Sequence, residues 1–138
     1  MDLINYSNMV SNKDLYLSIS EANKVTKSYD LILSNQEILD IINIKNKTLS
    51  ENSLFEFENN VIVLFMEKFC KSSYIDKDEW SYLLSELIVI FYNVRKSISN
   101  KISDEAIVNK MFNIFNNQAR GSFILLKDIC LEGSEYFE

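Results

Sequence analysis

The sequence contains no histidine and no proline, only two glycines and only two cysteines. Without histidine there is no Ser–His or Cys–His nucleophile pair, no imidazole base and no histidine-containing metal site. Gly121 and Gly133 alone do not make a phosphate-binding loop, and two cysteines are too few for a structural zinc site. We therefore expect a protein that is not an enzyme, with no catalytic residue, no metal ligand and no cofactor.

The scarcity of glycine and proline also bears on the fold. Turn-rich β structures use these residues to interrupt the chain, whereas helices joined by tight polar loops do not need them. The chain has 138 residues, of which 47% are hydrophobic, so it is long enough to bury a sizeable core. We predict an all-α, compact single-domain bundle of five to seven helices over residues 1–138, in which residues 132–138 form a short acidic tail.

The charge and the ends of the chain indicate the kind of partner and the compartment. The net charge is −6 and the fourteen basic residues are scattered, which argues against a nucleic-acid partner because such binding needs clustered lysine and arginine. The start, Met1-Asp2-Leu3, lacks the basic region and apolar run of a signal peptide. No uncharged apolar stretch reaches the ~18 residues of a membrane span. We expect a cytoplasmic protein with no membrane partner.

The two cysteines, Cys70 and Cys130, fall at apolar helical positions. In a reducing cytosol such residues are usually buried free thiols, and this is our prediction for both. A disulfide or a reactive thiol is the alternative.

Residues 60–72 and 77–99 are predicted to form the two central helices. In the second, the apolar side chains fill an arc of roughly 160° at 100° per residue, whereas a surface helix needs a stripe of only ~100°. These side chains are Trp80, Leu83, Leu84, Leu87, Ile88, Ile90, Phe91, Val94 and Ile98. The helix should therefore be covered on two sides. The first helix has a polar edge made only by Glu67, Lys68 and Lys71.

Capping residues mark the ends of the other predicted helices. Ser34 and Glu37 have the spacing of a capping box, and Ser103 and Ser122 each precede an apolar helical period. Gly121 is placed to end a helix in the left-handed conformation.

The N-terminal segment is predicted to hold a short helix over residues 2–10 and a second helix from Ser11 to about Tyr29. Ser11 and Asp14 have the spacing of a capping box, and the second helix would bury Val25 and Tyr29. Residues 54–58 alternate between apolar and polar, and we interpret them as an extended linker. In the tail, Tyr136 and Phe137 are predicted to be exposed.

Two surface features of the 77–99 helix are candidates for function. Val89 lies at the centre of the face opposite the apolar arc, between Tyr82 and Tyr92. Because tyrosine is favoured at interfaces, Tyr82, Val89 and Tyr92 form our candidate interface, which requires all three to be exposed and contiguous. Burial under the N-terminal segment is the alternative.

The second feature is the acidic cluster of Asp76, Asp78 and Glu79 at the start of this helix. Negative charge is stabilised there by the helix dipole, so we interpret the cluster as helix capping, with Asp76 and Glu79 forming a capping box. It lacks the glycine and the spacing of a calcium loop, and metal binding is the alternative.

Aromatic and capping motifs run along about residues 20–132. They are Tyr29-Asp30-Leu31-Ile32-Leu33-Ser34, Phe55-Glu56-Phe57, Phe69-Cys70-Lys71-Ser72-Ser73-Tyr74-Ile75, Ile90-Phe91-Tyr92, Ser103-Asp104-Glu105, Met111-Phe112, Phe115 and Gly121-Ser122. In these motifs the chain resembles a family of short proteins of anaerobic Gram-positive bacteria, known only as a domain of unknown function. Asn59 and Asn60 stand where that pattern has glycine. The resemblance implies a bacterial, cytosolic, helical protein and implies no activity.

Three functions follow as hypotheses. The leading one is a non-catalytic protein-interaction module, an accessory or regulatory subunit whose partner is another protein or a second copy of the chain. The alternative is a small-molecule or metal-binding protein that uses carboxylates and Tyr74 or Tyr92. The third is a nucleic-acid regulator built on residues 104–131, whose final helix has Lys127 as its only basic residue.

Overall fold

The computed structural model describes residues 3–54, 60–133 and 137, and in this part of the chain it contains six α-helices and no strand. The helices are α1 (Leu3–Thr26), α2 (Asn35–Glu51), α3 (Val61–Phe69), α4 (Trp80–Ser97), α5 (Asp104–Asn116) and α6 (Phe123–Glu132). Short 3-10 helices, Lys27–Tyr29 and Lys77–Glu79, precede α2 and α4. The prediction of a compact all-α fold with five to seven helices is confirmed.

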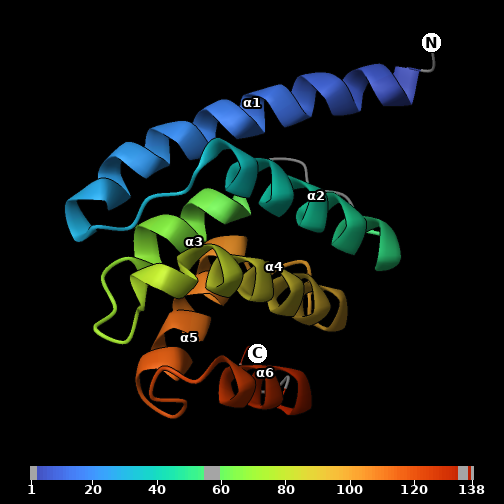
Figure 1. Ribbon diagram of the computed structural model, residues 1–138. Coiled ribbons are helices and arrows are strands. Elements are labelled where there is room, and N and C mark those ends of the chain that lie inside the picture. Colours follow the sequence, from blue (N-terminus) through green and yellow to red (C-terminus); the bar gives the residue numbers. More distant parts are fainter. Residues whose placement is uncertain (1–2, 55–59, 134–136, 138) are drawn as a thin grey trace.

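The helices are arranged as three successive pairs that form three layers (Figure 1). The pair of α1 and α2 lies at one end, α3 and α4 lie in the middle, and α5 and α6 lie at the other end. Within this stack α1 packs on α3 and α3 on α5, while α2 packs on α4 and α4 on α6. The middle pair therefore has a neighbouring layer on each side, whereas each outer pair has one on a single side.

This arrangement explains why α4 has so wide an apolar arc. All nine residues predicted to form the arc are buried, and Leu84, Leu87, Ile88 and Phe91 have no exposed surface. Because α2 and α6 pack on different sides of α4 and α3 packs beside it, only a narrow strip of this helix faces solvent. The prediction that the segments 60–72 and 77–99 form the centre of the bundle is confirmed.

The predicted helix starts agree with the structure where a side chain accepts a hydrogen bond from a free backbone amide of the first turn. The Ser34 hydroxyl accepts a hydrogen bond from the Glu37 amide, and the Glu37 carboxylate accepts one from the Ser34 amide, so the capping box is complete. The hydroxyls of Ser103 and Ser122 cap α5 and α6. Gly121 has the predicted positive φ, 85°, but its predicted position at the end of a helix is wrong, because α5 already ends at Asn116 and Gly121 lies in the turn before α6.

The predictions for the N-terminal segment are partly wrong. Instead of two helices that meet at Ser11, one continuous helix, α1, runs through this residue, because nothing in the sequence there interrupts the backbone hydrogen bonds. Val25 and Tyr29 are 54% and 47% exposed rather than buried. The chain leaves the α-helical conformation at Lys27, and Asp30, with a φ of 63°, turns it away.

The two irregular segments give a mixed result. Residues 55–59 of the predicted linker and Tyr136 of the tail lie outside the described residues. Phe137 is buried, with 8% of its surface exposed, so its predicted exposure is wrong and its ring joins the core. No helix in the described ranges combines the length and the apolar character that crossing a membrane requires.

Candidate functional site

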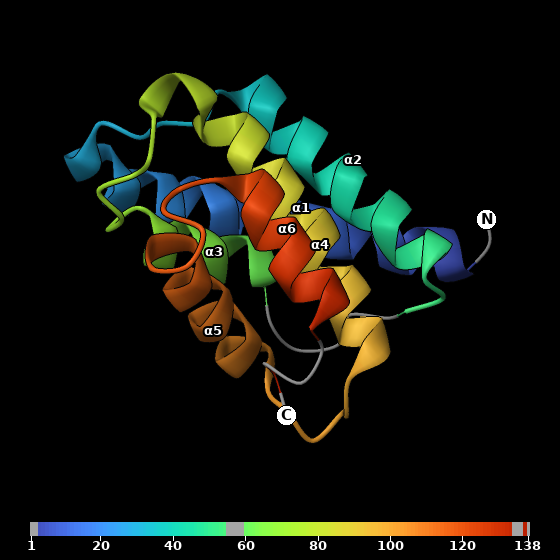
Figure 2. The same ribbon diagram turned by 90° about the horizontal axis from the view of Figure 1, so that it is seen from below.

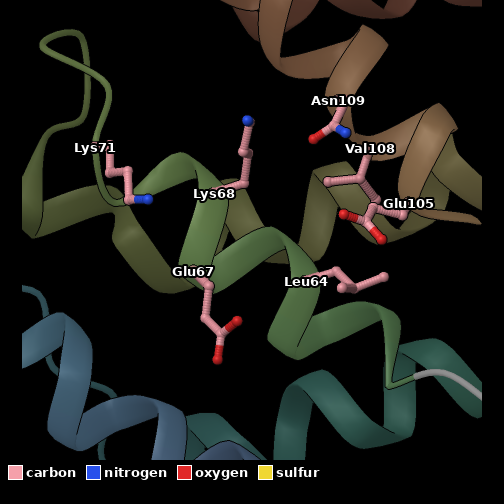
Figure 3. A pocket seen from close by; sticks show the side chains of 7 residues that line it. All are labelled: Leu64, Glu67, Lys68, Lys71, Glu105, Val108 and Asn109. Atoms are coloured by element: carbon pink, nitrogen blue, oxygen red, sulfur yellow. The ribbon is translucent and has the colours of Figure 1, made fainter.

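A cleft of about 230 Å³ opens between α3 and α5 (Figure 3). One stripe of residues from each helix lines it. The first stripe has the spacing i, i+3, i+4 and i+7; its first three residues lie on one face of α3, and Lys71 lies in the turn after the helix. The α5 stripe has the spacing i, i+3 and i+4 and follows one face of its helix. The lining residues are Leu64, Glu67, Lys68 and Lys71 on the α3 side, and Glu105, Val108 and Asn109 on the α5 side.

Aromatic side chains next to the cleft hold the two helices together. The ring of Phe69 on α3 lies 5.3 Å, between centroids, from the rings of both Phe112 and Phe115 on α5. Phe69 and Phe115 are fully buried, and tilted ring pairs of this kind contribute ~0.5–1.5 kcal/mol each beyond the burial of their area. The width of the cleft is therefore set by a packed interface.

Lys68 connects this aromatic interface to the cleft. Its Nζ atom lies 5.2 Å from the centroid of the Phe112 ring, in the geometry of a cation–π contact. Figure 3 shows Lys68 and Glu67 extending to opposite sides of α3. Among the described residues neither Lys68 nor Lys71 forms an ion pair, so both ammonium groups are available to a ligand.

The cleft presents charged, amide and apolar groups to a ligand. The two ammonium groups can bind a carboxylate or phosphate, and the Asn109 amide can both donate to and accept from a peptide group. Leu64 is half-buried and offers an apolar surface between the charges, whereas Val108 is only 2% exposed and belongs to the core. The volume lies below the ~300–1,000 Å³ typical of drug-sized ligand pockets, which suits a side chain or a short chain segment.

The three residues of the predicted interface do not form one exposed surface. Tyr82 is 54% exposed, Val89 is half-buried and Tyr92 is only 3% exposed, so the required exposure of Tyr92 is wrong. Tyr92 lies at the edge of the buried arc, where the layers on both sides of α4 extend the covered surface, and its ring packs on Phe91 at 5.0 Å. Tyr82 packs edge-on against Phe123 of α6, with 5.5 Å between centroids.

The acidic cluster at the start of α4 acts on the backbone. The Asp76 carboxylate accepts a hydrogen bond from the Asp78 amide and so begins the 3-10 turn before α4, instead of the predicted capping box with Glu79. Lys77 forms an ion pair with Asp30 at 3.1 Å, and this contact raises the pKa of Lys77. Within the described residues no three Cys, Asp or Glu side chains are grouped closely enough to hold a metal ion.

Both cysteines are free and buried, as predicted. Burial raises the pKa of the Cys70 thiol, and it raises the pKa of Cys130 to about 12. Because the thiolate is the reactive form of cysteine, these raised pKa values make both thiols less reactive.

The fold and the cleft can now be set beside known proteins. The model of a protein family described as "Family of unknown function (DUF6323)" matches residues 18–135. The chain belongs to this family. The matched range covers the last nine residues of α1, all of α2 to α6 and every residue of the cleft, and it confirms the resemblance to a domain of unknown function. No curated protein and no solved structure matches the chain.

Part of this site is visible in the sequence as a polar helix edge. Glu67, Lys68 and Lys71 were singled out only as the polar edge of a central helix. The further signal in the sequence is that Leu64 shares their stripe, because an apolar residue within a polar stripe marks a surface that is neither core nor fully solvated. The partner stripe on α5 begins forty-one residues later, at Glu105, and only the packing of α3 on α5 brings the two together.

Proposed function

We propose that the protein is a non-catalytic protein-interaction module, an accessory or regulatory subunit of a cytosolic complex in an anaerobic Gram-positive bacterium. The observation that carries this proposal is the cleft between α3 and α5, with its paired stripes of charged, amide and apolar side chains. The two buried free thiols are consistent with a reducing compartment.

The cleft favours a particular kind of partner segment. A carboxylate of the partner, from an acidic side chain or a chain terminus, binds between Lys68 and Lys71. An apolar side chain of the same segment rests on Leu64, and Asn109 pairs with its backbone. A groove between two packed helices with apolar anchors and a charged rim is a common way of recognising a short segment of another protein.

Affinity purification with a matched pair of variants tests the proposal. Lys68→Ala with Lys71→Ala removes both ammonium groups of the cleft, and Lys13→Ala with Lys27→Ala makes the same charge change at exposed positions on α1 and just after it. Host proteins that the original chain captures should be captured in the same amount by the control variant. The cleft variant should capture at least about tenfold less of them, which corresponds to a loss of about 1.4 kcal/mol of binding free energy. Mass spectrometry with isotope labelling measures the ratios.

A second measurement connects a captured protein to the cleft. Overlapping peptides from that protein should include one that binds the isolated chain in fluorescence anisotropy, more weakly at higher salt because exposed charges are screened. Its affinity should fall in the cleft variant and stay unchanged in the control. The proposal fails if no captured protein distinguishes the two variants.

Small-molecule binding is the second candidate function, and one feature of the cleft favours it. Glu105 places a carboxylate on the side facing the lysines, so the cleft presents both charge signs to a small zwitterion such as an amino acid (Figure 3). The tyrosines named in the sequence analysis do not line the cleft. Metal binding has no support from the described residues.

A thermal-shift screen of amino acids and small organic acids separates this candidate from the first. A ligand of the cleft should raise the melting temperature of the original chain, and the shift should disappear in Glu105→Gln and in Lys68→Ala. A screen without such a ligand leaves the interaction module as the better account of the cleft.

A further inference from the structure

The last helix, α6, has an apolar surface on its outer side as well as on its inner side. Leu126 and Cys130 are buried on the inner side, where α6 packs on α4. On the outside of the molecule, where Figure 2 shows α6 in front of α4, Ile124 is 62% exposed and Leu131 is 42% exposed. An end layer of a stacked helical fold normally presents a polar outer face, so exposed Ile and Leu at this position need an explanation.

These two residues are the apolar ends of a stripe whose two middle residues are charged. Ile124, Lys127, Asp128 and Leu131 have the spacing i, i+3, i+4 and i+7, and at 100° per residue they occupy an arc of about 100°. All four are exposed. Within the part of the chain that the structure describes, neither Lys127 nor Asp128 forms an ion pair.

The stripe is complementary to itself when the second helix runs in the opposite direction. A two-fold axis between Lys127 and Asp128 places Ile124 opposite Leu131 of the second copy, and places Lys127 opposite Asp128 of the second copy. The apolar pair and the charge pair then each form twice across the interface. A parallel arrangement instead sets lysine against lysine and aspartate against aspartate, which is unfavourable.

From this complementarity we propose that the protein forms a two-fold symmetric dimer in which the α6 helices of two copies pack antiparallel. Such an isologous interface requires a surface that matches itself under a two-fold rotation, and this stripe does. Tyr82, 54% exposed and packed on Phe123, flanks the stripe and extends the apolar surface at the start of α6.

The short length of α6 limits the expected affinity of the dimer. A ten-residue helix is ~15 Å long, whereas a standard interface buries ~800 Å² on each partner. The α6 pair therefore supplies only part of a standard interface, and we expect a dissociation constant of about 10–100 µM. The dimer face shares no residue with the cleft between α3 and α5, so its existence does not depend on the proposed function.

Sedimentation equilibrium between about 5 and 500 µM measures the dimer directly. The average mass should rise from 16.1 kDa towards twice this value over the concentration series. Ile124→Ser with Leu131→Ser should remain monomeric throughout. The matched control, Leu17→Ser with Ile32→Ser, changes two residues that are 54% and 53% exposed in the opposite end layer, and it should dimerise like the original chain.

Charge exchange identifies the partner and the direction of the helices. Lys127→Asp and Asp128→Lys, as separate variants, should each weaken self-association at least about tenfold because like charges then face each other. An equal mixture of the two variants should dimerise again, and the double exchange Lys127→Asp with Asp128→Lys should dimerise alone. Circular dichroism checks that each variant keeps its helix content.

Three results overturn the proposal. They are a monomer at every concentration, a dimer that persists in the Ile124 and Leu131 variant, and a charge mixture that associates no better than its components.

Discussion

Helices α4 and α6 are both apolar around much of their circumference, but they lie in different surroundings. α4 lies in the middle layer with α2 and α6 on different sides, and nine of its side chains are buried. α6 lies in an end layer, and only Leu126 and Cys130 are buried among its ten residues. The apolar residues of α4 are therefore part of the core, whereas many of those of α6 are exposed to solvent.

An apolar helix face in a sequence indicates that this face will be buried, but it does not indicate which segment or partner will cover it. For α4 the neighbouring layers of the same chain provide the cover. For α6 no further layer exists among the described residues, and a second copy of the chain provides the cover in the dimer proposed above. Exposed apolar patches of this kind often mark interaction sites.

A matched pair of leucine substitutions gives the largest expected effect. Leu87 of α4 has no exposed surface, so Leu87→Ala should lower the free energy of unfolding by about 2–5 kcal/mol through the cavity it leaves. Leu125 of α6 is 48% exposed, and Leu125→Ala should cost less than about 0.5 kcal/mol. Urea denaturation of dilute protein measures both. Similar losses of unfolding free energy in the two variants would contradict the difference in burial between α4 and α6.

Gly121 tests how the end layer is joined to the middle layer. Its φ of 85° is strained for alanine, and an added Cβ would lie 2.6 Å from Cβ of Tyr74, in the loop between α3 and α4. Gly121→Ala should therefore cost about 1–3 kcal/mol.

The adjacent Arg120, with a φ of 48°, provides the control for this test. Arg120→Gly should cost nothing beyond the greater freedom of the unfolded chain, because glycine tolerates positive φ. Thermal melts compare the two variants. An unchanged melting temperature for Gly121→Ala would show that the turn relaxes freely.

Cys130 reports on the inner side of α6 through the pH dependence of stability. The pKa of the folded thiol is raised to about 12, whereas an unfolded thiol ionises near ~8.5. Between these values the unfolded chain binds fewer protons than the folded chain, so stability falls as pH rises, by about 1.4 kcal/mol per pH unit. Below this window the thiol is neutral in both states and the stability is fully present.

Denaturation at pH 8, 9 and 10 measures this slope against the variant Cys130→Ala, which lacks the titrating group. The difference in the free energy of unfolding between the original chain and Cys130→Ala should become smaller or change sign as pH increases. A difference that does not change with pH would show that water reaches the thiol in the folded protein.

The smallest expected effect concerns the solvent-facing strip of α4. Val89 is half-buried, so Val89→Glu leaves the carboxylate in contact with water and should cost less than about 1 kcal/mol. Val94 is 2% exposed, and Val94→Glu should cost several times more because it buries an unpaired charge. Circular dichroism melts compare the two. A large loss for Val89→Glu would mean that this side of α4 is covered as well.

The cleft between α3 and α5 was less predictable than the core because each of its stripes looks ordinary by itself. Glu67, Lys68 and Lys71 resemble the solvated edge of any surface helix, and Glu105 and Asn109 resemble the polar side of α5. Their significance comes from the distance between two helices, which depends on the packing of Phe69 against Phe112 and Phe115. Such long-range packing leaves no periodic signal in the sequence.

What the sequence determined by itself is the helical class, the central helices and the helix starts at Ser34, Ser103 and Ser122. These features depend on residues a few positions apart, so the local pattern contains the information they need. The tertiary structure decided that Tyr92 and Phe137 are buried while Val25 and Tyr29 are exposed. It also brought the two stripes of the cleft together, because burial and proximity depend on which distant segment lies over each face.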